Sequence, residues 1–225
     1  MSNIHVIFKN NTNFNAVGVR ARGPVLGAAK STLTNIIVDD LTSGMSNIGV
    51  VISDTNVISS NINVNKCLNG GVNISADAAN AQLINCTATS CGNGFSNSAP
   101  NAKLMFCEAI SSVSEGFRDY GTSESSYAFC QSIDAGTYGF RSVSGSVNIT
   151  LAYCKSSGSG TSDYATGASA RAFMCDGYIG DSLLQNSDSA YVQFGDYSGL
   201  STESVTGYVS IKDNNGNIRK IATVS

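Results

Sequence analysis

Three carboxylates form the densest acidic group in the chain: Glu115, Asp119 and Asp134. Glycoside hydrolysis uses two carboxylates roughly 5 to 10 Å apart, on either side of the bond that breaks. These three residues are therefore the candidate catalytic groups for cleavage of a polysaccharide. They lie in no catalytic motif, so the sequence leaves open whether the protein cleaves anything.

Two arginines and two tyrosines lie close to these carboxylates. Arg118 and Arg141 each follow a Gly-Phe pair, and Tyr120 and Tyr138 are near them in sequence. Guanidinium groups bind acidic sugars and phosphates, and tyrosine can replace the absent tryptophan as a platform for sugar rings. The four residues are candidate glycan-binding groups. The alternative is that the arginines form salt bridges with the three carboxylates.

The chain has seven cysteines and one histidine. The cysteines include no C-x-x-C pair and His5 is remote from them, so no metal site is expected. G-x-G-x-x-G, the Walker loop, H-E-x-x-H and G-x-S-x-G are all absent, and no cofactor is expected. We expect most cysteines to be reduced core residues, with a Cys67–Cys91 disulfide left open.

The cysteine spacing indicates a structural repeat. Five cysteines are separated by 21, 23, 24 and 21 residues: Cys86, Cys107, Cys130, Cys154 and Cys175. A glycine followed by an apolar residue recurs with the same period: Gly49-Val50, Gly71-Val72, Gly94-Phe95, Gly116-Phe117 and Gly139-Phe140. Each unit of about 22 residues has room only for short strands and turns, which is typical of a solenoid.

These units predict an all-β fold, a single-stranded parallel β-helix of about seven coils over residues 33–188. The segments Leu83–Phe95 and Val64–Val72 resemble coils of the pectin-lyase-like right-handed β-helix superfamily. The resemblance covers roughly residues 33 to 188 and implies a right-handed β-helix. It does not specify a function, because lyases, hydrolases, adhesins and phage spikes share this fold.

Strand alternation predicts which side chains enter the core, because residues i and i+2 share a face. If the cysteines face inward, the residues two positions before them do too: Ile84, Met105, Ala128, Ala152 and Phe173. The residues two positions after them are small and share that side: Ala88, Ala109, Ser132, Ser156 and Gly177. A separate outer column follows the glycine–apolar pairs: Asn73, Ser96, Arg118, Arg141 and Ala165.

The residue immediately before each cysteine is then expected to face outward. Four of these residues are large and apolar or aromatic: Phe106, Phe129, Tyr153 and Met174. Soluble monomers rarely expose such a stripe. We interpret it as a trimer interface, with coverage by another part of the same chain as the alternative.

The two ends depart from the repeat. Residues 1–32 are expected to form a cap or a segment that attaches to other proteins. Residues 189–225 contain two segments of alternating polar and apolar residues on either side of Asp213-Asn-Asn-Gly216, a pattern that predicts a β-hairpin. The hairpin resembles the closing segments that follow β-helices in bacteriophage tail spikes and fibres. That resemblance implies a trimerisation or capping hairpin, a homotrimer, and attachment to other phage tail proteins through the N-terminus.

Composition restricts the partners. The net charge is −3 with no basic cluster, so nucleic acid is not expected as a partner. We find no signal peptide and no apolar run long enough for membrane insertion. The phage resemblance implies a virion protein that folds in the cytoplasm of the bacterial host, where cysteines stay reduced.

The sequence therefore predicts a homotrimeric phage tail spike or fibre that binds a host surface polysaccharide. Two alternatives remain open at this stage. One is a monomeric polysaccharide-degrading enzyme of the pectin-lyase-like kind, and the other is a purely structural phage protein such as an adaptor or a decoration.

Overall fold

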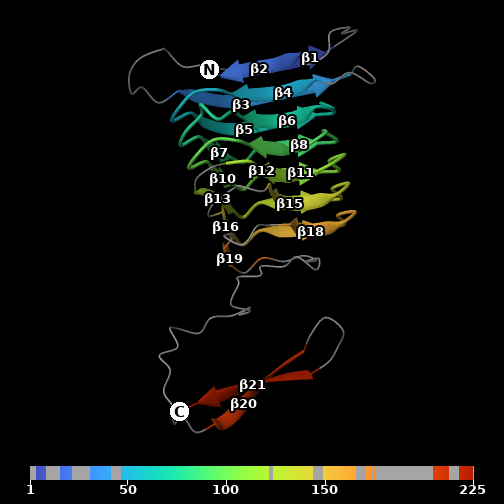
Figure 1. The fold of residues 1–225 in the computed structure, drawn as a ribbon. Coiled ribbons are helices and arrows are strands. Elements are labelled where there is room, and N and C mark those ends of the chain that lie inside the picture. The colour runs from blue at the N-terminus through green and yellow to red at the C-terminus, as the bar shows by residue number, and fades with distance from the viewer. Residues whose placement is uncertain are drawn as a thin grey trace. The chain divides into compact units, whose positions relative to one another are not determined.

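The computed structural model describes residues 4–8, 16–21, 31–41, 47–121, 124–143, 149–165, 171–173, 175, 205–212 and 218–224. It contains two compact units, residues 1–189 and 190–225. The first is a solenoid of parallel strands, consistent with the right-handed β-helix expected from the repeat (Figure 1). No helix occurs in the part of the chain that the structure describes.

Two parallel sheets form the solenoid. The larger begins with β1 (Ile4–Phe8), β3 (Thr32–Asp40) and β5 (Ile58–Asn65). Beyond β5 it divides into two rows. One row is β7 (Gln82–Ile84), β10 (Lys103–Met105), β13 (Ser125–Ala128), β16 (Ile149–Ala152) and β19 (Arg171–Phe173). The other row is β8 (Thr87–Thr89), β11 (Glu108–Ile110), β14 (Gln131–Ile133) and β17 (Lys155–Ser157).

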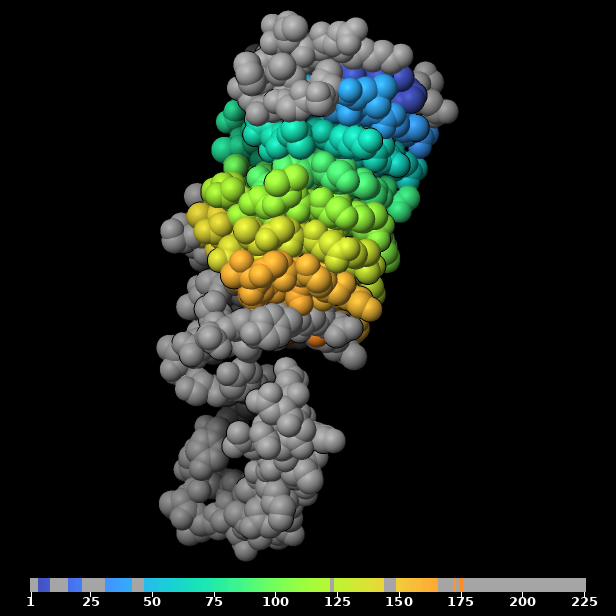
Figure 2. Space-filling view, turned by 90° about the vertical axis from the view of Figure 1, so that its right-hand side faces the viewer, coloured from blue at the N-terminus to red at the C-terminus, as the bar shows by residue number. Residues whose placement is uncertain are grey.

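The second sheet has seven strands and closes each turn. They are β2 (Val17–Ala21), β4 (Ile48–Ile52), β6 (Gly70–Ile74), β9 (Phe95–Asn97), β12 (Phe117–Asp119), β15 (Tyr138–Ser142) and β18 (Ser162–Ala165). Successive turns lie on one another as bands (Figure 2). The repeat gives about five turns, slightly fewer than the seven expected, and β2 and β4 extend the second sheet toward the N-terminus. The predicted coils extended to residue 188, whereas the last described strand of the solenoid ends at Phe173.

The ends of the chain also form strands. In the expected N-terminal cap, β1 pairs with β3 and β2 pairs with β4, both in parallel, so the described parts of residues 1–32 continue the stack. In the second unit, β20 (Val205–Lys212) and β21 (Ile218–Val224) form the expected antiparallel hairpin. Its turn, residues 213–217, lies outside the described residues.

The core is built from like residues stacked in register. Phe95, Phe117, Phe140 and Tyr164 are buried and their rings stack, with centroids 4.9, 4.6 and 5.4 Å apart. Opposite them the described cysteines, apart from the half-buried Cys175, are fully buried, as predicted. Each stacked ring pair adds about 0.5–1.5 kcal/mol beyond its burial.

The glycine series is explained by a close approach of the two walls. A Cβ atom on Gly94 would lie 2.6 Å from Ala109 Cβ and 2.6 Å from the Gly116 carbonyl oxygen. A Cβ on Gly71 would similarly lie 2.7 Å from Ala88 Cβ. Only glycine fits at these positions, because they lie opposite the small residues that follow each cysteine by two positions. The glycine series and the cysteine series therefore depend on each other.

One prediction about the core is wrong. Ile84, Met105, Ala128 and Ala152 are only partly buried, and the residues preceding them fill the core instead: Leu83, Leu104, Tyr127 and Leu151. The cause is the corner residue before each cysteine, which has a left-handed backbone, with φ of 54° at Asn85 and Phe106. This single residue turns the chain between two strands and shifts the alternation by one position. Phe173 and Gly177, also predicted to face inward, have no described side chain.

Candidate functional site

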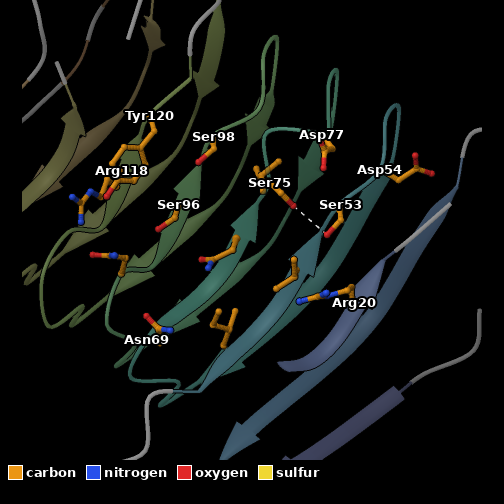
Figure 3. A pocket seen from close by; sticks show the side chains of 15 residues that line it. Arg20, Ser53, Asp54, Asn69, Ser75, Asp77, Ser96, Ser98, Arg118 and Tyr120 are labelled. Carbon is orange, nitrogen blue, oxygen red and sulfur yellow. Dashed lines mark hydrogen bonds between the residues drawn. The ribbon is translucent and has the colours of Figure 1, made fainter. Parts of the chain in front are cut away.

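An open polar groove lies on the outer face of the second sheet. It has a volume of about 860 Å³ and crosses strands β2, β4, β6, β9 and β12 (Figure 3). Five strands at about 4.8 Å spacing make it roughly 19 Å long, parallel to the solenoid axis. We call this surface the groove.

Two columns of side chains form its floor. The first runs along equivalent positions of the five strands: Arg20, Val51, Asn73, Ser96 and Arg118. The second consists of the residues that follow the strands: Ser53, Ser75, Ser98 and Tyr120. In Figure 3 the labelled members of both columns project from the same side of the sheet. The sequence predicted the first column from Asn73 onward, and the structure confirms that it faces outward.

The groove offers a hydroxyl or amide group on each turn from β4 to β12. Ser75 Oγ donates to the Ile52 carbonyl at 2.7 Å and lies 3.1 Å from Ser53 Oγ, which fixes the orientation of this pair. Asp54 and Asp77 follow two successive strands and lie at the edge of the groove. Such a surface provides many weak polar contacts and little apolar area, which suits a hydroxylated ligand.

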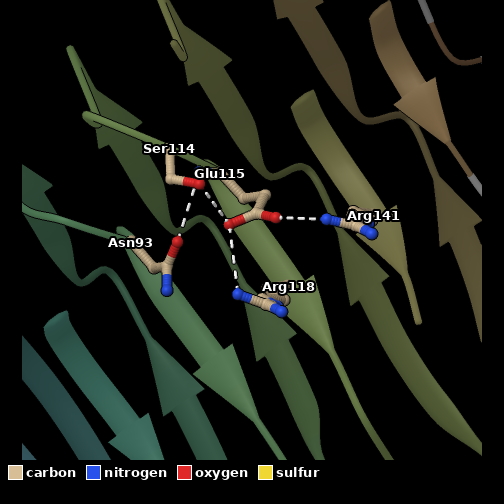
Figure 4. Close-up of polar contacts among 5 residues, drawn as sticks. All are labelled: Asn93, Ser114, Glu115, Arg118 and Arg141. Atoms are coloured by element: carbon tan, nitrogen blue, oxygen red, sulfur yellow. Dashed lines mark hydrogen bonds and ion pairs between the residues drawn. The ribbon is translucent and has the colours of Figure 1, made fainter. Parts of the chain in front are cut away.

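One end of the groove is organised by a buried carboxylate. Glu115 is 1% exposed and accepts hydrogen bonds from Arg141 Nη1 at 2.7 Å and from Ser114 Oγ at 2.7 Å (Figure 4). Arg118 Nη1 lies 3.5 Å from Oε2 of Glu115, the oxygen that also accepts the Ser114 hydrogen bond. The predicted salt bridges between the arginines and a carboxylate are therefore confirmed for Glu115. They neutralise the repulsion between two arginines on adjacent turns.

The predicted glycan-binding residues form two pairs. The Arg118 guanidinium lies 4.4 Å from the centre of the Tyr120 ring, and the Arg141 guanidinium lies 5.0 Å from the centre of the Tyr138 ring. Arg118 and Tyr120 line the groove. The sequence thus identified one end of the groove.

The three predicted catalytic carboxylates have different surroundings. Asp119 is 2% exposed and accepts hydrogen bonds from Tyr127 Oη at 2.6 Å, Asn97 Nδ2 at 3.0 Å and the Gly121 amide at 2.6 Å. Asp134 is exposed at a left-handed corner with φ of 53°. Glu115 and Asp119 therefore belong to separate hydrogen-bonding networks, and their catalytic role stays a prediction.

The predicted interface stripe is exposed in the part that the structure describes. Phe106, Phe129 and Tyr153 are 56%, 51% and 51% exposed. Their rings are stacked, with centroids 5.1 and 5.0 Å apart. We call these three residues the aromatic column. Met174, the fourth predicted member, lies outside the described residues.

Six of the seven cysteines are buried in the core. Cys67 and Cys91 are free thiols rather than a disulfide, as are Cys86, Cys107, Cys130 and Cys154. Burial raises the pKa of the Cys91 thiol to about 11, so it is protonated at neutral pH. Among the described residues, no group of three or more His, Cys, Asp or Glu side chains is placed to hold a metal ion.

Sequence analysis missed most of the groove. Arg20 lies in the segment that we assigned to a cap, and Ser53, Asp54, Asn69 and Asp77 are unremarkable polar residues in or near turns. The available signal was the repeat itself. Serine recurs one position after the strand in three successive turns, at Ser53, Ser75 and Ser98.

Comparisons with other proteins give no relative: no protein-family model, curated protein or solved structure matches the chain significantly. The described residues contain no helix that is long and apolar enough to span a membrane.

Proposed function

We propose that this protein binds a bacterial surface polysaccharide in the groove, as a homotrimeric component of a bacteriophage tail. The observation that carries the proposal is the groove itself, about 860 Å³ in volume and floored by repeated hydroxyl and amide groups. A polymer lying along the solenoid axis would meet similar groups at each turn. The expected N-terminal attachment and the virion location are part of the same proposal.

The chemistry of the groove favours recognition of sugars. The Tyr120 ring is exposed and is held by Arg118, while Arg20 lies exposed at the other end. Ring faces and guanidinium groups bind sugar rings and acidic substituents respectively, and serine and asparagine exchange hydrogen bonds with hydroxyl groups. The free cysteines suit a protein that folds in a reducing compartment.

Binding without cleavage is the simpler function for this site. Glu115 and Asp119 are buried and already hydrogen-bonded to neighbouring side chains. A general acid must reach the glycosidic oxygen, and a nucleophile must reach the sugar ring. Either role would require these contacts to open, so we propose recognition as the function.

The test is binding of the full chain to purified bacterial capsular and O-antigen polysaccharides, measured by biolayer interferometry. Ser96→Tyr places a large side chain in the middle of the groove and is expected to weaken binding about tenfold or more. Ser60→Tyr is the matched control, since Ser60 is a half-buried serine in strand β5 of the other sheet. Equal binding by the Ser96→Tyr variant and the control, or no binding to any polysaccharide, would overturn the proposal.

A further inference from the structure

Five cysteines occupy equivalent positions on successive turns of the solenoid: Cys86, Cys107, Cys130, Cys154 and Cys175. Each lies two positions after a strand that pairs in register with the next strand of its row. Neighbouring parallel strands lie about 4.8 Å apart, so each of these cysteines is adjacent to the next along the stack. We call the five residues the thiol column.

The last member of the thiol column differs from the others in its exposure. The first four cysteines are no more than 1% exposed, whereas Cys175 is half-buried. Reaction of a thiol with a dissolved oxidant requires access as well as the thiolate form. Within the column, Cys175 is therefore the residue that such an oxidant reaches first.

Cys154 is in contact with the thiols on either side of it. Hydrogen bonds with Cys130 and then with Cys175 lower the pKa of the Cys154 thiol below its ordinary value. The thiolate is the form of cysteine that attacks a disulfide. The buried Cys154 is thus prepared to react with a sulfur atom at the position of Cys175.

The backbone at this pair is compatible with a disulfide. Ala152 and Phe173 are direct partners in the β16–β19 pairing, and Cys154 and Cys175 follow them by two positions each. A disulfide needs Cα atoms 4.4–6.8 Å apart, and in-register neighbours on parallel strands fall within this range. A bond between the two cysteines therefore leaves the register of the strands unchanged.

Cys67 and Cys91 provide an internal comparison. They also lie on adjacent turns, three positions after the paired residues Val64 and Ala88. Both are 0% exposed, and burial raises the pKa of the Cys91 thiol to about 11. This pair has neither access for an oxidant nor a thiolate, so adjacency alone does not make it reactive.

We propose that Cys154 and Cys175 are an oxidation site, at which an intramolecular disulfide forms and joins β19 to β16. The Cys175 thiolate attacks a low-molecular-weight disulfide such as glutathione disulfide, and one glutathione thiol leaves. The Cys154 thiolate then attacks the Cys175 sulfur of the mixed disulfide, and the second glutathione thiol leaves. The two cysteines lose two protons and two electrons, and the oxidant is reduced to two thiols.

The bond acts at the end of the described stack. Among the described strands, β19 pairs with β16 alone and is the last of its row. A cross-link over the 21 residues between the two cysteines restricts the unfolded forms of this segment. In the proposed function the chain folds in a reducing compartment and acts outside the cell, so the bond would form after release. The oxidation site itself does not depend on the groove.

The first experiment oxidises the full reduced chain with glutathione disulfide and maps the product by mass spectrometry after trypsin digestion. Trypsin cleaves after Arg141, Lys155, Arg171 and Lys212, so the expected product joins residues 142–155 to residues 172–212. Absence of a disulfide, a glutathione adduct that persists on Cys175, or linkage of a different cysteine pair would each overturn the proposal.

The second experiment measures the effect of the bond by hydrogen–deuterium exchange. Exchange in residues 171–173 is expected to be about tenfold or more slower in the oxidised chain than in the reduced chain. Cys175→Ser should abolish this difference. Cys67→Ser is the matched control and should retain it, because serine can still donate to the Asn65 carbonyl as Cys67 does. Equal exchange in the oxidised and reduced wild type would contradict the proposed attachment of β19.

Polysaccharide binding separates this inference from the proposed function. The strands of the groove end at β12, so the oxidised and reduced chains are expected to bind polysaccharide equally. A chain that forms the Cys154–Cys175 disulfide and binds no polysaccharide would overturn the proposed function alone. A chain that binds polysaccharide and forms no disulfide would overturn this inference alone.

Discussion

Two buried carboxylates, Glu115 and Asp119, organise the polar contacts of the side chains around them. Glu115 joins Arg118 and Arg141 on neighbouring turns, and Asp119 joins Tyr127 to Asn97. Their acidic character was visible in the sequence, and so was the possibility of pairing with arginine. Their burial was not, because it depends on which side of each strand faces the core. That in turn depends on the corner residues.

The Tyr127–Asp119 hydrogen bond gives a prediction at this scale. Tyr127→Phe removes a 2.6 Å hydrogen bond to a buried carboxylate and is expected to lower the free energy of unfolding by about 1.5–3 kcal/mol. Urea denaturation measures this. Tyr120→Phe is the control, because Tyr120 is 40% exposed, and an equal effect in both variants would contradict the assignment.

The same tyrosine predicts a dependence on pH. Burial, followed by the nearby Asp119 charge, raises the pKa of Tyr127 well above its ordinary value of 10.0. The folded state therefore holds this proton more tightly than the unfolded state does. Its contribution to stability is fully present below pH 10 and falls as the pH rises further. This fall should be smaller in Tyr127→Phe than in the wild type.

At the scale of the strands, the period was sufficient to predict the fold. Two residue series with one period imply that each turn lies on the last, and the structure confirms this for the glycine and cysteine series. The prediction that failed concerned the residues two positions before each cysteine, which were expected to face the core and are only partly buried. A left-handed backbone is compatible with the asparagines at this corner, which are Asn35, Asn61 and Asn85. The equivalent positions on later turns are Phe106 and Phe129, and phenylalanine gives no indication of such a backbone in the sequence.

The close contact between the two sheets of the solenoid predicts how a substitution at a repeated glycine affects stability. A Cβ on Gly116 would meet Ser132 Oγ and would lie 2.8 Å from the Gly139 carbonyl oxygen. Gly116→Ala is therefore expected to destabilise the chain by about 1–3 kcal/mol, measured by thermal or urea unfolding. Adding Ser132→Gly should recover part of the loss but not all, since the backbone contact remains. No loss in Gly116→Ala would contradict the close approach of the walls.

At the scale of the whole solenoid, the groove is a property of the stack. Residues that are distant in sequence, such as Arg20 and Arg118, line one surface because they occupy equivalent positions on different turns. Sequence analysis identified only the end at which arginine and tyrosine stand out. The remainder is made of serine and asparagine, whose importance becomes visible only when the turns are stacked.

Hydrogen–deuterium exchange with and without a bound polysaccharide tests the central claim most directly. A ligand lying along the groove should slow exchange in separate segments that recur once per turn: residues 53–55, 75–78, 98–101 and 120–121. The polysaccharide is one that binds in the interferometry panel, and the Ser96→Tyr variant serves as the unprotected reference. Slowing confined to one continuous segment, or found only around the aromatic column, would contradict a glycan-binding groove on this solenoid.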